Sequence, residues 1–225
     1  AKEFADRFFF IYQGFEGKAA LHLDHTRDLE TIKAAVDAGF NSVMIDASQK
    51  SFEENIALTR ETVLYAHERN AEVEAELGRI GATDKIETDN DESLYTVPEE
   101  AEEFVERTGV DTLAVSIGTA HGVYPVKNPK IDLERLARIR ERVDIPLVLH
   151  GGSGLPAETV QKAISINGGG VSKINIATDL EQAFLKSLGC GRKLNSEIWK
   201  LDQAARSKAG EAVQAVVEDK MVNFV

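Results

Sequence analysis

The sequence contains little cysteine and proline and no long hydrophobic run. Among its 225 residues there are 1 cysteine and 5 prolines. A single cysteine cannot form an internal disulfide, which excludes a disulfide-stapled secreted scaffold. No apolar run approaches the roughly 18 residues that a membrane helix requires, and no charged and then apolar signal segment opens the chain. We therefore expect a protein of the reducing cytoplasm that does not span a membrane.

Positive charge is also scarce. The chain has 26 Lys and Arg residues against 38 Asp and Glu residues, which gives a net charge of −12. Such a field repels nucleic-acid backbones and anionic lipid headgroups, and no local basic patch offsets it. We therefore expect neither nucleic acid nor a membrane as a partner. Hydrophobic residues make up 43% of the chain, which is enough for a single globular domain over residues 1–225.

From residue 18 onward, short β-branched apolar runs alternate with segments of helical period. This alternation is typical of parallel βα units, in either a barrel or a doubly wound sheet. Polar and glycine-rich clusters follow nearly every predicted strand, which favours a barrel whose site is built from many loops. The six predicted strands are Lys18–His25, Asn41–Ala47, Glu72–Leu77, Thr112–Ile117, Pro146–His150 and Val171–Ile176.

Helix boundaries are marked by short polar motifs. Ser51 and Glu54 have the spacing of a capping box, and Thr96 and Glu99 repeat it ahead of an apolar stripe that ends at Gly109. These spacings predict helices that begin at both boxes.

The two ends of the chain carry aromatic residues without a strand pattern of their own. Residues 1–17 are expected to form a helix with Phe8–Ile11 packed inward, or alternatively an irregular strand. Residues 196–225 read as a longer helical stretch in which Trp199 and Phe224 cover apolar surface.

Three histidines, His25, His121 and His150, lie at the ends of three different predicted strands. Three imidazoles from three loops around one rim can bind a single divalent metal and leave a coordination position open. The alternative is that each is a hydrogen-bonded rim residue, since no local spacing motif requires a metal.

Carboxylates lie beside these histidines in the sequence. Asp24 directly precedes His25, so it is a candidate proton donor and acceptor, or else it only orients a histidine. Glu74 and Glu76 alternate toward one face of their strand, and Glu76 is the better candidate for supporting a metal or a nearby loop. His22 points the same way as Asp24 and is either a supporting group or part of the filling of the barrel.

Glycine-rich and polar turns follow the last two predicted strands. Gly151–Gly154 and Asn175–Thr178 stand where barrels commonly bind phosphate through backbone N–H groups. We therefore expect a phosphate-binding site there.

Six motifs, taken together and in order over residues 18 to 180, closely resemble the class II zinc-dependent ketose-bisphosphate aldolases. The motifs are His22-Leu23-Asp24-His25, Val43-Met44-Ile45-Asp46, Val73-Glu74-Ala75-Glu76-Leu77-Gly78, Gly118-Thr119-Ala120-His121-Gly122, Leu149-His150-Gly151-Gly152-Ser153-Gly154 and Lys173-Ile174-Asn175-Ile176. The resemblance implies a (β/α)₈ TIM barrel of carbohydrate metabolism and glycolysis. It further implies a lyase that reversibly cleaves fructose or tagatose 1,6-bisphosphate to dihydroxyacetone phosphate and glyceraldehyde 3-phosphate.

The resemblance also assigns roles to individual residues. It implies that His25, His121 and His150 bind Zn²⁺, and that Asp24 is the acid and base acting on the aldol hydroxyl. Glu76, from strand alternation, is counted with the expected metal-binding group. The resemblance implies contacts to dihydroxyacetone phosphate, a monovalent cation (Na⁺ or K⁺) near its phosphate, and a homodimer or homotetramer. The implied substrate contacts are Gly122, Gly151, Gly152, Ser153, Asn175, Ile176, Ala177 and Thr178.

Two departures from the family pattern bear on the proton transfer and on the closure of the barrel. Asp84 stands where the family has a mobile-loop glutamate, so we expect it to exchange the second proton with a side chain one methylene shorter. Only residues 1–17 precede the first matching motif, where the family has two βα units. Six strands cannot close an eight-stranded barrel, so we expect either a missing start or closure by another segment or subunit.

Two other functions remain open at this stage. The chain could be a catalytically silent phosphate-binding partner or remnant, or an aldolase for a related keto-deoxy sugar acid phosphate. Ala177, where fructose-specific relatives often carry Asp, favours tagatose or another related substrate over fructose.

Overall fold

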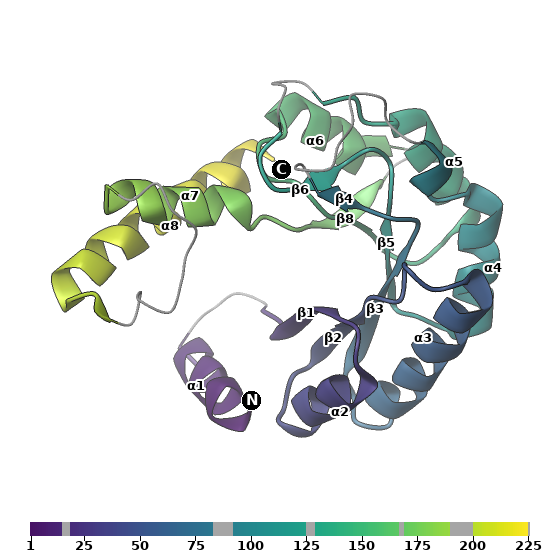
Figure 1. The fold of residues 1–225 in the computed structure, drawn as a ribbon, viewed down its shortest axis with the longest axis horizontal. Coiled ribbons are helices and arrows are strands. Elements are labelled where there is room, and N and C mark those ends of the chain that lie inside the picture. The colour runs from purple at the N-terminus through teal and green to yellow at the C-terminus, as the bar shows by residue number, and fades with distance from the viewer. Residues whose placement is uncertain (15–18, 83–91, 125–128, 167–168, 190–199, 225) are drawn as a thin grey trace.

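The computed structural model describes residues 1–225 except 15–18, 83–91, 125–128, 167–168, 190–199 and 225 (Figure 1). Its α-helices are α1 Lys2–Tyr12, α2 Leu29–Asp37, α3 Phe52–His67, α4 Pro98–Thr108, α5 Leu133–Arg142, α6 Ala157–Ser165, α7 Thr178–Ser187 and α8 Gln203–Asn223. Its strands are β1 His22–Thr26, β2 Ser42–Ile45, β3 Glu72–Leu77, β4 Gly81–Ala82, β5 Thr112–Val115, β6 Ala120–His121, β7 Leu147–Leu149 and β8 Val171–Ile174, and a 3₁₀ turn covers Glu92–Leu94.

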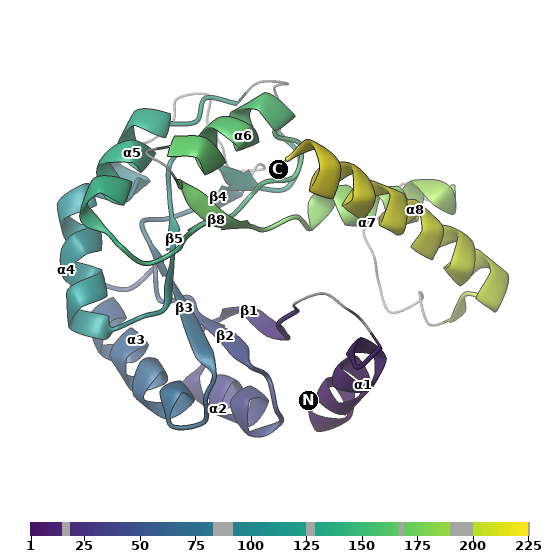
Figure 2. The same ribbon diagram turned by 180° about the vertical axis from the view of Figure 1, so that it is seen from behind.

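The main sheet is six-stranded, parallel and curled. Its strand order is β1-β2-β3-β5-β7-β8, so sequence order and spatial order agree. Helices α2 to α6 lie along the convex side of this sheet, as Figures 1 and 2 both show. A doubly wound sheet would instead reverse its strand order at a switch point. The arrangement is therefore a half-barrel, in agreement with the predicted barrel-type architecture.

The curled sheet stays open between its first and last strands. Within the described residues β1 and β8 each pair with one neighbour only, and α1 lies on one side of the opening while α7 and α8 lie on the other (Figure 2). Closure of this opening by two further βα units, or by a subunit, stays a prediction.

The predicted strands correspond to the strands of the main sheet. The segment 72–77 is found with unchanged ends. The first strand begins four residues later than predicted and ends one residue later, at Thr26, and the other four are shorter than predicted. A further parallel pair, β4 with β6, had not been predicted because each strand has only two residues. Strand β6 includes His121, so this short pair helps to place one of the candidate ligands.

Helix starts were predicted with mixed success. The capping box at the start of α3 is confirmed, since the side chain of Ser51 and the side chain of Glu54 each bond the backbone N–H of the other. The box predicted at Thr96 is wrong, because the Thr96 hydroxyl donates to the carbonyl of Leu77 in β3 and Val97 occupies the cap position without a side-chain bond. The predicted stop at Gly109 is confirmed by its left-handed φ of 68°.

The ends of the chain are helical. Residues 2–12 form α1, so the alternative of a strand is wrong, and the predicted inward packing of Phe8–Ile11 is also wrong because Phe10 and Ile11 are 75% and 70% exposed. Helix α8 begins at Gln203, where the Asp202 side chain accepts from the backbone N–H of Ala205. Phe224 is buried as predicted, and Trp199 lies outside the described residues.

Strand alternation decides what enters the barrel interior. In β2, Val43 and Ile45 belong to the large core cluster that also holds buried residues of α2 to α6, whereas Met44 belongs to a separate small cluster with Ala114 and Val148. Burial of a large apolar side chain contributes about 1.5–3 kcal/mol, so the large cluster holds the helices on the sheet. The opposite face is left for polar side chains from β1, β3 and β8.

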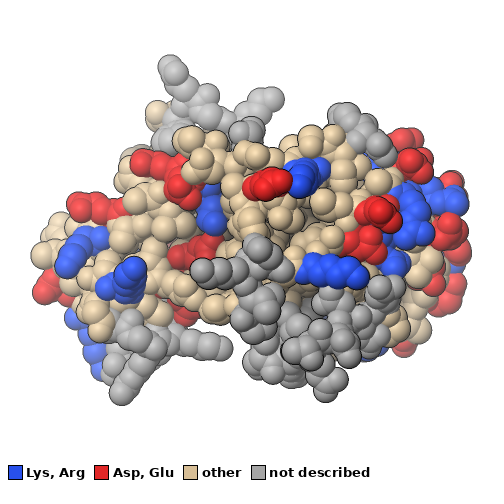
Figure 3. Space-filling view, turned by 90° about the horizontal axis from the view of Figure 1, so that it is seen from above, with Lys and Arg blue, Asp and Glu red and all other residues tan. Residues whose placement is uncertain are grey.

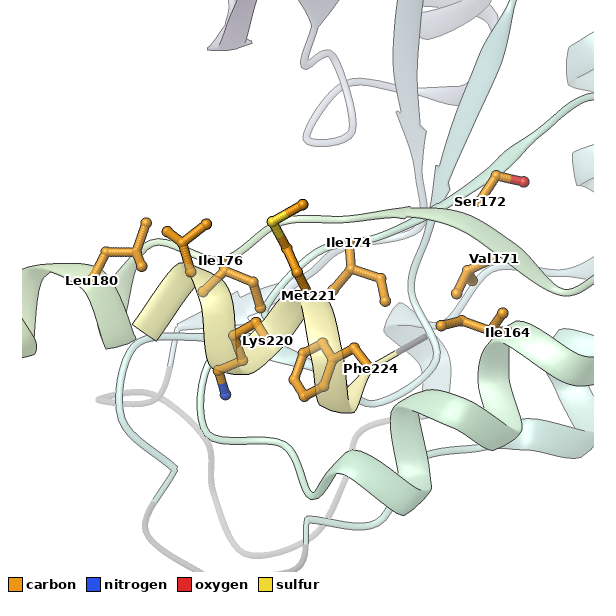
Figure 4. A pocket seen from close by; sticks show the side chains of 10 residues that line it. Ile164, Val171, Ser172, Ile174, Ile176, Leu180, Lys220, Met221 and Phe224 are labelled. Carbon is orange, nitrogen blue, oxygen red and sulfur yellow. The ribbon is translucent and has the colours of Figure 1, made fainter. Parts of the chain in front are cut away.

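An apolar cavity of about 480 Å³ lies beside β8, between α6, α7 and α8. Its walls include Ile174, Ile176, Met221 and Phe224, and Lys220 is its only charged lining residue (Figure 4). The histidines are not part of its lining, but Ile174 and Ile176 also lie against Gly152 in the turn after β7.

The surface in Figure 3 carries acidic and basic side chains that are interspersed rather than separated by sign. None of the helices described is both long and apolar enough to cross a bilayer.

Candidate metal centre and reaction site

Three histidines converge at one end of the half-barrel. His25 lies near the end of β1, His121 ends β6, and His150 follows β7 directly. Their ring centroids are 4.6 to 5.8 Å apart. His25 has a φ of 47°, which is uncommon for a residue with a Cβ and turns its side chain out of the regular strand alternation. The structure thus brings together the three residues that the sequence singled out.

Each of two rings is oriented by a buried carboxylate. Nε2 of His150 lies 2.8 Å from Oε1 of Glu74, and Nδ1 of His25 lies 3.4 Å from Oδ2 of Asp46. Because a carboxylate only accepts hydrogen bonds, these nitrogens carry the ring hydrogens. The remaining nitrogens, Nδ1 of His150 and Nε2 of His25, face one another at 2.9 Å.

The donor set fits a divalent metal. The candidate ligand atoms of His25, His121 and His150 all lie within 4.8 Å of one another. Oε2 of Glu76 is buried without a hydrogen-bond partner among the described residues, and it lies 3.6 Å from Nδ1 of His150. An orphaned carboxylate oxygen beside three imidazoles is the chemistry that Zn²⁺ and similar ions select.

The surroundings of His121 favour the neutral form of its imidazole. Burial, together with the neighbouring rings of His25 and His150, lowers the pKa of His121 to about 4. A metal ligand must present a neutral imidazole, so His121 is ready to bind without losing a proton at neutral pH.

The carboxylates beneath the rings differ in character. Burial raises the pKa of Glu76 to about 7, and the nearby charge of Asp46 adds to the rise. Burial also opposes ionisation of Asp46, but hydrogen bonds to His25 and Ser48 outweigh it and hold the pKa of Asp46 well below its usual range. A cation bound nearby would favour the ionised form of Glu76, so this carboxyl group could supply a negative charge when a metal binds.

Asp24 lies beside the three histidines on the more open side. Its side chain is 50% exposed, and its Oδ1 accepts a hydrogen bond of 3.2 Å from Nδ2 of Asn175. Burial opposes ionisation, but the neighbouring His22 ring and the charges of His25 and His150 hold the pKa of Asp24 well below its usual range. The carboxylate is therefore ionised, solvent-accessible and able to accept a proton.

The glycine-rich turn after β7 packs against the loops on both sides. A Cβ on Gly151, whose φ is 68°, would stand 2.5 Å from the carbonyl oxygen of Ala120. A Cβ on Gly152 would stand 2.5 Å from Cγ2 of Ile174. Glycine is required here because the backbone must approach this closely.

The remaining predicted contact residues surround this turn. Ser153 Oγ accepts from the backbone N–H of Asp179 at the start of α7, and the backbone N–H of Gly152 donates to the carbonyl of Asn175. Ala177 is the N-cap residue of α7 and Thr178 its first residue. Ile176 lies against Gly152, and Gly122 follows His121 with a φ of 108°. Asp84 lies outside the described residues.

The geometry brings into the site two residues, Lys173 and Tyr124, to which the sequence had assigned no role. Lys173 Nζ lies 2.6 Å from Glu74 Oε2. The Tyr124 hydroxyl accepts from the N–H of Ala120 and donates to the carbonyl of Gly151, both at 2.8 Å. Strand alternation could have found Lys173, since it lies two residues before Asn175. Tyr124 had no comparable signal, because its partners are backbone groups, one in β6 and one in the turn after β7.

Known proteins are similar to this chain in sequence and in fold. The family model described as fructose-bisphosphate aldolase class-II matches residues 11–225. The crystal structure of the YdjI aldolase from Escherichia coli K12 is 37% identical, with a TM-score of 0.81 over 99% of this chain and 75% of that chain. A candidate fructose-1,6-bisphosphate aldolase from Coccidioides immitis is 35% identical, with a TM-score of 0.76 over 96% of this chain and 76% of that one. The fructose-bisphosphate aldolase of Campylobacter jejuni, at 24% identity, shares the fold with a TM-score of 0.72 over 98% of this chain and 75% of that chain.

Proposed function

The chain belongs to the class II fructose-bisphosphate aldolase family, and from this premise we propose that it reversibly cleaves a ketose 1,6-bisphosphate to dihydroxyacetone phosphate and glyceraldehyde 3-phosphate. The observation that carries the proposal is the convergence of three imidazoles beside an ionised, accessible carboxylate.

His25, His121 and His150 would hold a divalent ion, for which we propose Zn²⁺, with Glu76 as the counter-charge. When bound, the ion supplies a Lewis acid that stabilises the negative charge left on the substrate carbon and oxygens as the carbon–carbon bond breaks. The protein supplies the orientation of the rings, through Asp46 and Glu74, before the ion arrives.

Asp24 would move the proton of the reaction. During cleavage its carboxylate takes the proton of the C4 hydroxyl, and during synthesis it returns that proton to the new alkoxide. The hydrogen bond from Asn175 fixes one carboxylate oxygen, which leaves the other for the substrate. We propose Asp84 for the second proton exchange, at the triose-phosphate carbon.

The turns after β7 and β8 would bind the phosphate of dihydroxyacetone phosphate. Support comes from the close packing of Gly151 and Gly152 and from the nearby start of α7, whose N-terminal N–H groups favour an anion. The proposed contacts are Gly122, Gly151, Gly152, Ser153, Asn175, Ile176, Ala177 and Thr178, with Na⁺ or K⁺ beside the phosphate. Ala177 favours tagatose or a related sugar over fructose.

The experiment is a coupled assay of triose-phosphate release from fructose and tagatose 1,6-bisphosphate, before and after removal of metal with a chelator. We expect turnover that the chelator abolishes and added Zn²⁺ restores. Asp24→Asn is the matched variant: it should keep the fold and the bound metal while turnover falls by about 10²- to 10⁴-fold. Bound metal without turnover of either sugar would contradict the proposed reaction.

The same experiment separates the other functions. A catalytically silent phosphate-binding partner would bind dihydroxyacetone phosphate in a titration without any turnover. An aldolase for a keto-deoxy sugar acid phosphate would turn over that class of substrate instead. Self-association into a homodimer or homotetramer, and a cytoplasmic location, stay predictions, and sedimentation of the purified chain tests the first.

A further inference from the structure

A lysine connects the two open edges of the curled sheet through the interior of the half-barrel. Lys173 lies on β8, yet its Nζ is 2.6 Å from Oε2 of Glu74 on β3 and 3.4 Å from Nε2 of His22 on β1. His22, Asp24 and Glu74 form a group whose ligand atoms could by themselves hold a metal ion. The ammonium group of Lys173 reaches this group, so a fixed positive charge is already present there.

Glu74 uses its two oxygens for two different partners. Oε2 accepts from Lys173, while Oε1 accepts from Nε2 of His150 at 2.8 Å. Both Glu74 and His150 are almost completely buried, with side-chain exposures of 2% and 0%. A buried carboxylate is costly unless it is paired, and Lys173 is the only Lys or Arg that forms a described ion pair with Glu74.

The contact between Glu74 and His150 determines which ring nitrogen faces the other histidines. Because Glu74 accepts at Nε2, the hydrogen of the neutral ring resides there, and Nδ1 presents its lone pair toward His25. If the carboxylate turned away, His150 could rotate or adopt the other tautomer, and its lone pair would no longer face the site.

We propose that Lys173 is a positioning residue that acts through Glu74 to fix the ring orientation and tautomer of His150, and so sets the affinity of the three-histidine site for a divalent metal. This rests on the proposed function only in that the three histidines bind a metal. Neither turnover nor the identity of the sugar enters the argument.

The test measures metal binding directly. Lys173→Met keeps most of the aliphatic stem and removes the charge, Lys173→Arg keeps the charge, and Lys162→Met is a control at an exposed lysine of α6 that pairs with Glu158. The Zn²⁺ dissociation constant is measured by competition with a chromophoric chelator. The visible absorption spectrum of the Co²⁺-loaded protein reports the geometry of the ligands.

We expect Lys173→Met to weaken Zn²⁺ binding by about 10- to 100-fold, as loss of a ligand-orienting partner does, and to change the Co²⁺ spectrum. Lys173→Arg should restore most of the affinity, and Lys162→Met should leave both measurements unchanged. Wild-type affinity and an unchanged Co²⁺ spectrum in Lys173→Met would overturn the proposal.

A second variant guards against misfolding, since Lys173→Met leaves Glu74 buried without its counter-charge. The pair Glu74→Gln and Glu74→Gln/Lys173→Met removes that charge first. If Lys173 acts through Glu74, the two variants bind Zn²⁺ equally well, because the effects of coupled residues are not additive. A further 10-fold weakening by the second substitution would show independent action and refute the proposal.

The outcomes also separate this inference from the proposed reaction. A wild-type chain that binds Zn²⁺ but cleaves no sugar bisphosphate would end the proposed reaction, while the affinities of the Lys173 variants would still decide the role of Lys173. A wild-type chain that binds neither Zn²⁺ nor Co²⁺ would overturn the positioning role.

Discussion

Nε2 of His25 and Nδ1 of His150 lie 2.9 Å apart, so one of them must carry a hydrogen directed at the other. The hydrogen bond to Asp46 raises the pKa of His25 and outweighs the opposing effect of burial. A proton therefore binds His25 more readily than an ordinary histidine, and it would occupy the space between two candidate ligands.

Metal binding should release this proton, because a ligand must offer a lone pair. Since the pKa of His25 is raised, competition by protons begins at a higher pH than for an ordinary histidine. We expect the Zn²⁺ dissociation constant to rise as pH falls, by up to about tenfold per pH unit for each proton displaced. Titrations in buffers of different ionisation enthalpy count the protons, and an affinity independent of pH would contradict this assignment.

The contribution of Glu76 to the stability of the metal-free protein should be lost as pH rises toward neutrality. Glu76 has a pKa raised from 4.5 to about 7, so its contribution to the free energy of unfolding is present below 4.5 and is lost as pH rises through about 7. Glu76→Gln should flatten this decline in urea unfolding with chelator present. His25 acts in the same direction and His121, with its pKa lowered to about 4, in the opposite one, so the difference between the two proteins isolates Glu76. Equal slopes in the two proteins would show that Glu76 is not responsible.

Tyr124 should be needed for both stability and activity. Its hydroxyl is hydrogen-bonded both to Ala120 of β6, next to His121, and to Gly151, next to His150. Tyr124→Phe leaves the N–H of Ala120 without its partner, which costs about 1–3 kcal/mol in unfolding free energy. We also expect kcat/KM to fall by about tenfold or more, since small misplacements of reacting groups are costly.

Tyr65→Phe is the matched control for that substitution. Tyr65 lies on the outer helix α3, and its hydroxyl donates to the exposed carboxylate of Asp37 on α2. Its removal should change the unfolding free energy by about 0.5 kcal/mol or less and leave turnover intact. Similar losses in both variants would argue against a special role for Tyr124.

Two glycines with the same φ allow the cost of a left-handed backbone to be separated from the cost of a steric contact of an added Cβ. Gly151 and Gly109 both have a φ of 68°, but a Cβ would meet the Ala120 carbonyl only at Gly151, and nothing within 4 Å at Gly109. Gly109→Ala should therefore cost about 1–2 kcal/mol through its conformation alone. Gly151→Ala should cost about 1–3 kcal/mol more and also reduce turnover, because the turn must move. Equal costs would mean that the contact with Ala120 relaxes freely.

The sequence made the fold and the centre of the site predictable because both follow from local patterns. Strand alternation placed Glu74 and Glu76 on one face of β3, and the positions of His25, His121 and His150 at strand ends placed them on one rim. Both inferences need only the strand boundaries and the parallel arrangement.

What was not predictable depends on contacts between distant residues. Thr96 has the spacing of a capping residue, but its hydroxyl bonds β3, a choice that exists only once the sheet has formed. The inward packing of α1 failed because nothing described covers Phe10 and Ile11. Lys173 could be placed on a strand from the sequence, but its reach to Glu74, 99 residues earlier, could not.

The link between Asn175 and Asp24 has a mechanical consequence. These residues stand at opposite ends of the curled sheet, and a single 3.2 Å side-chain bond joins them where no backbone ladder is described. The distance from Asp24, the proposed base, to the turn after β8, which is proposed to bind phosphate, therefore depends on how tightly the sheet is bent. A change that stiffens or relaxes this bend, even in the outer helices, would therefore alter the spacing between Asp24 and the turns that are proposed to bind phosphate.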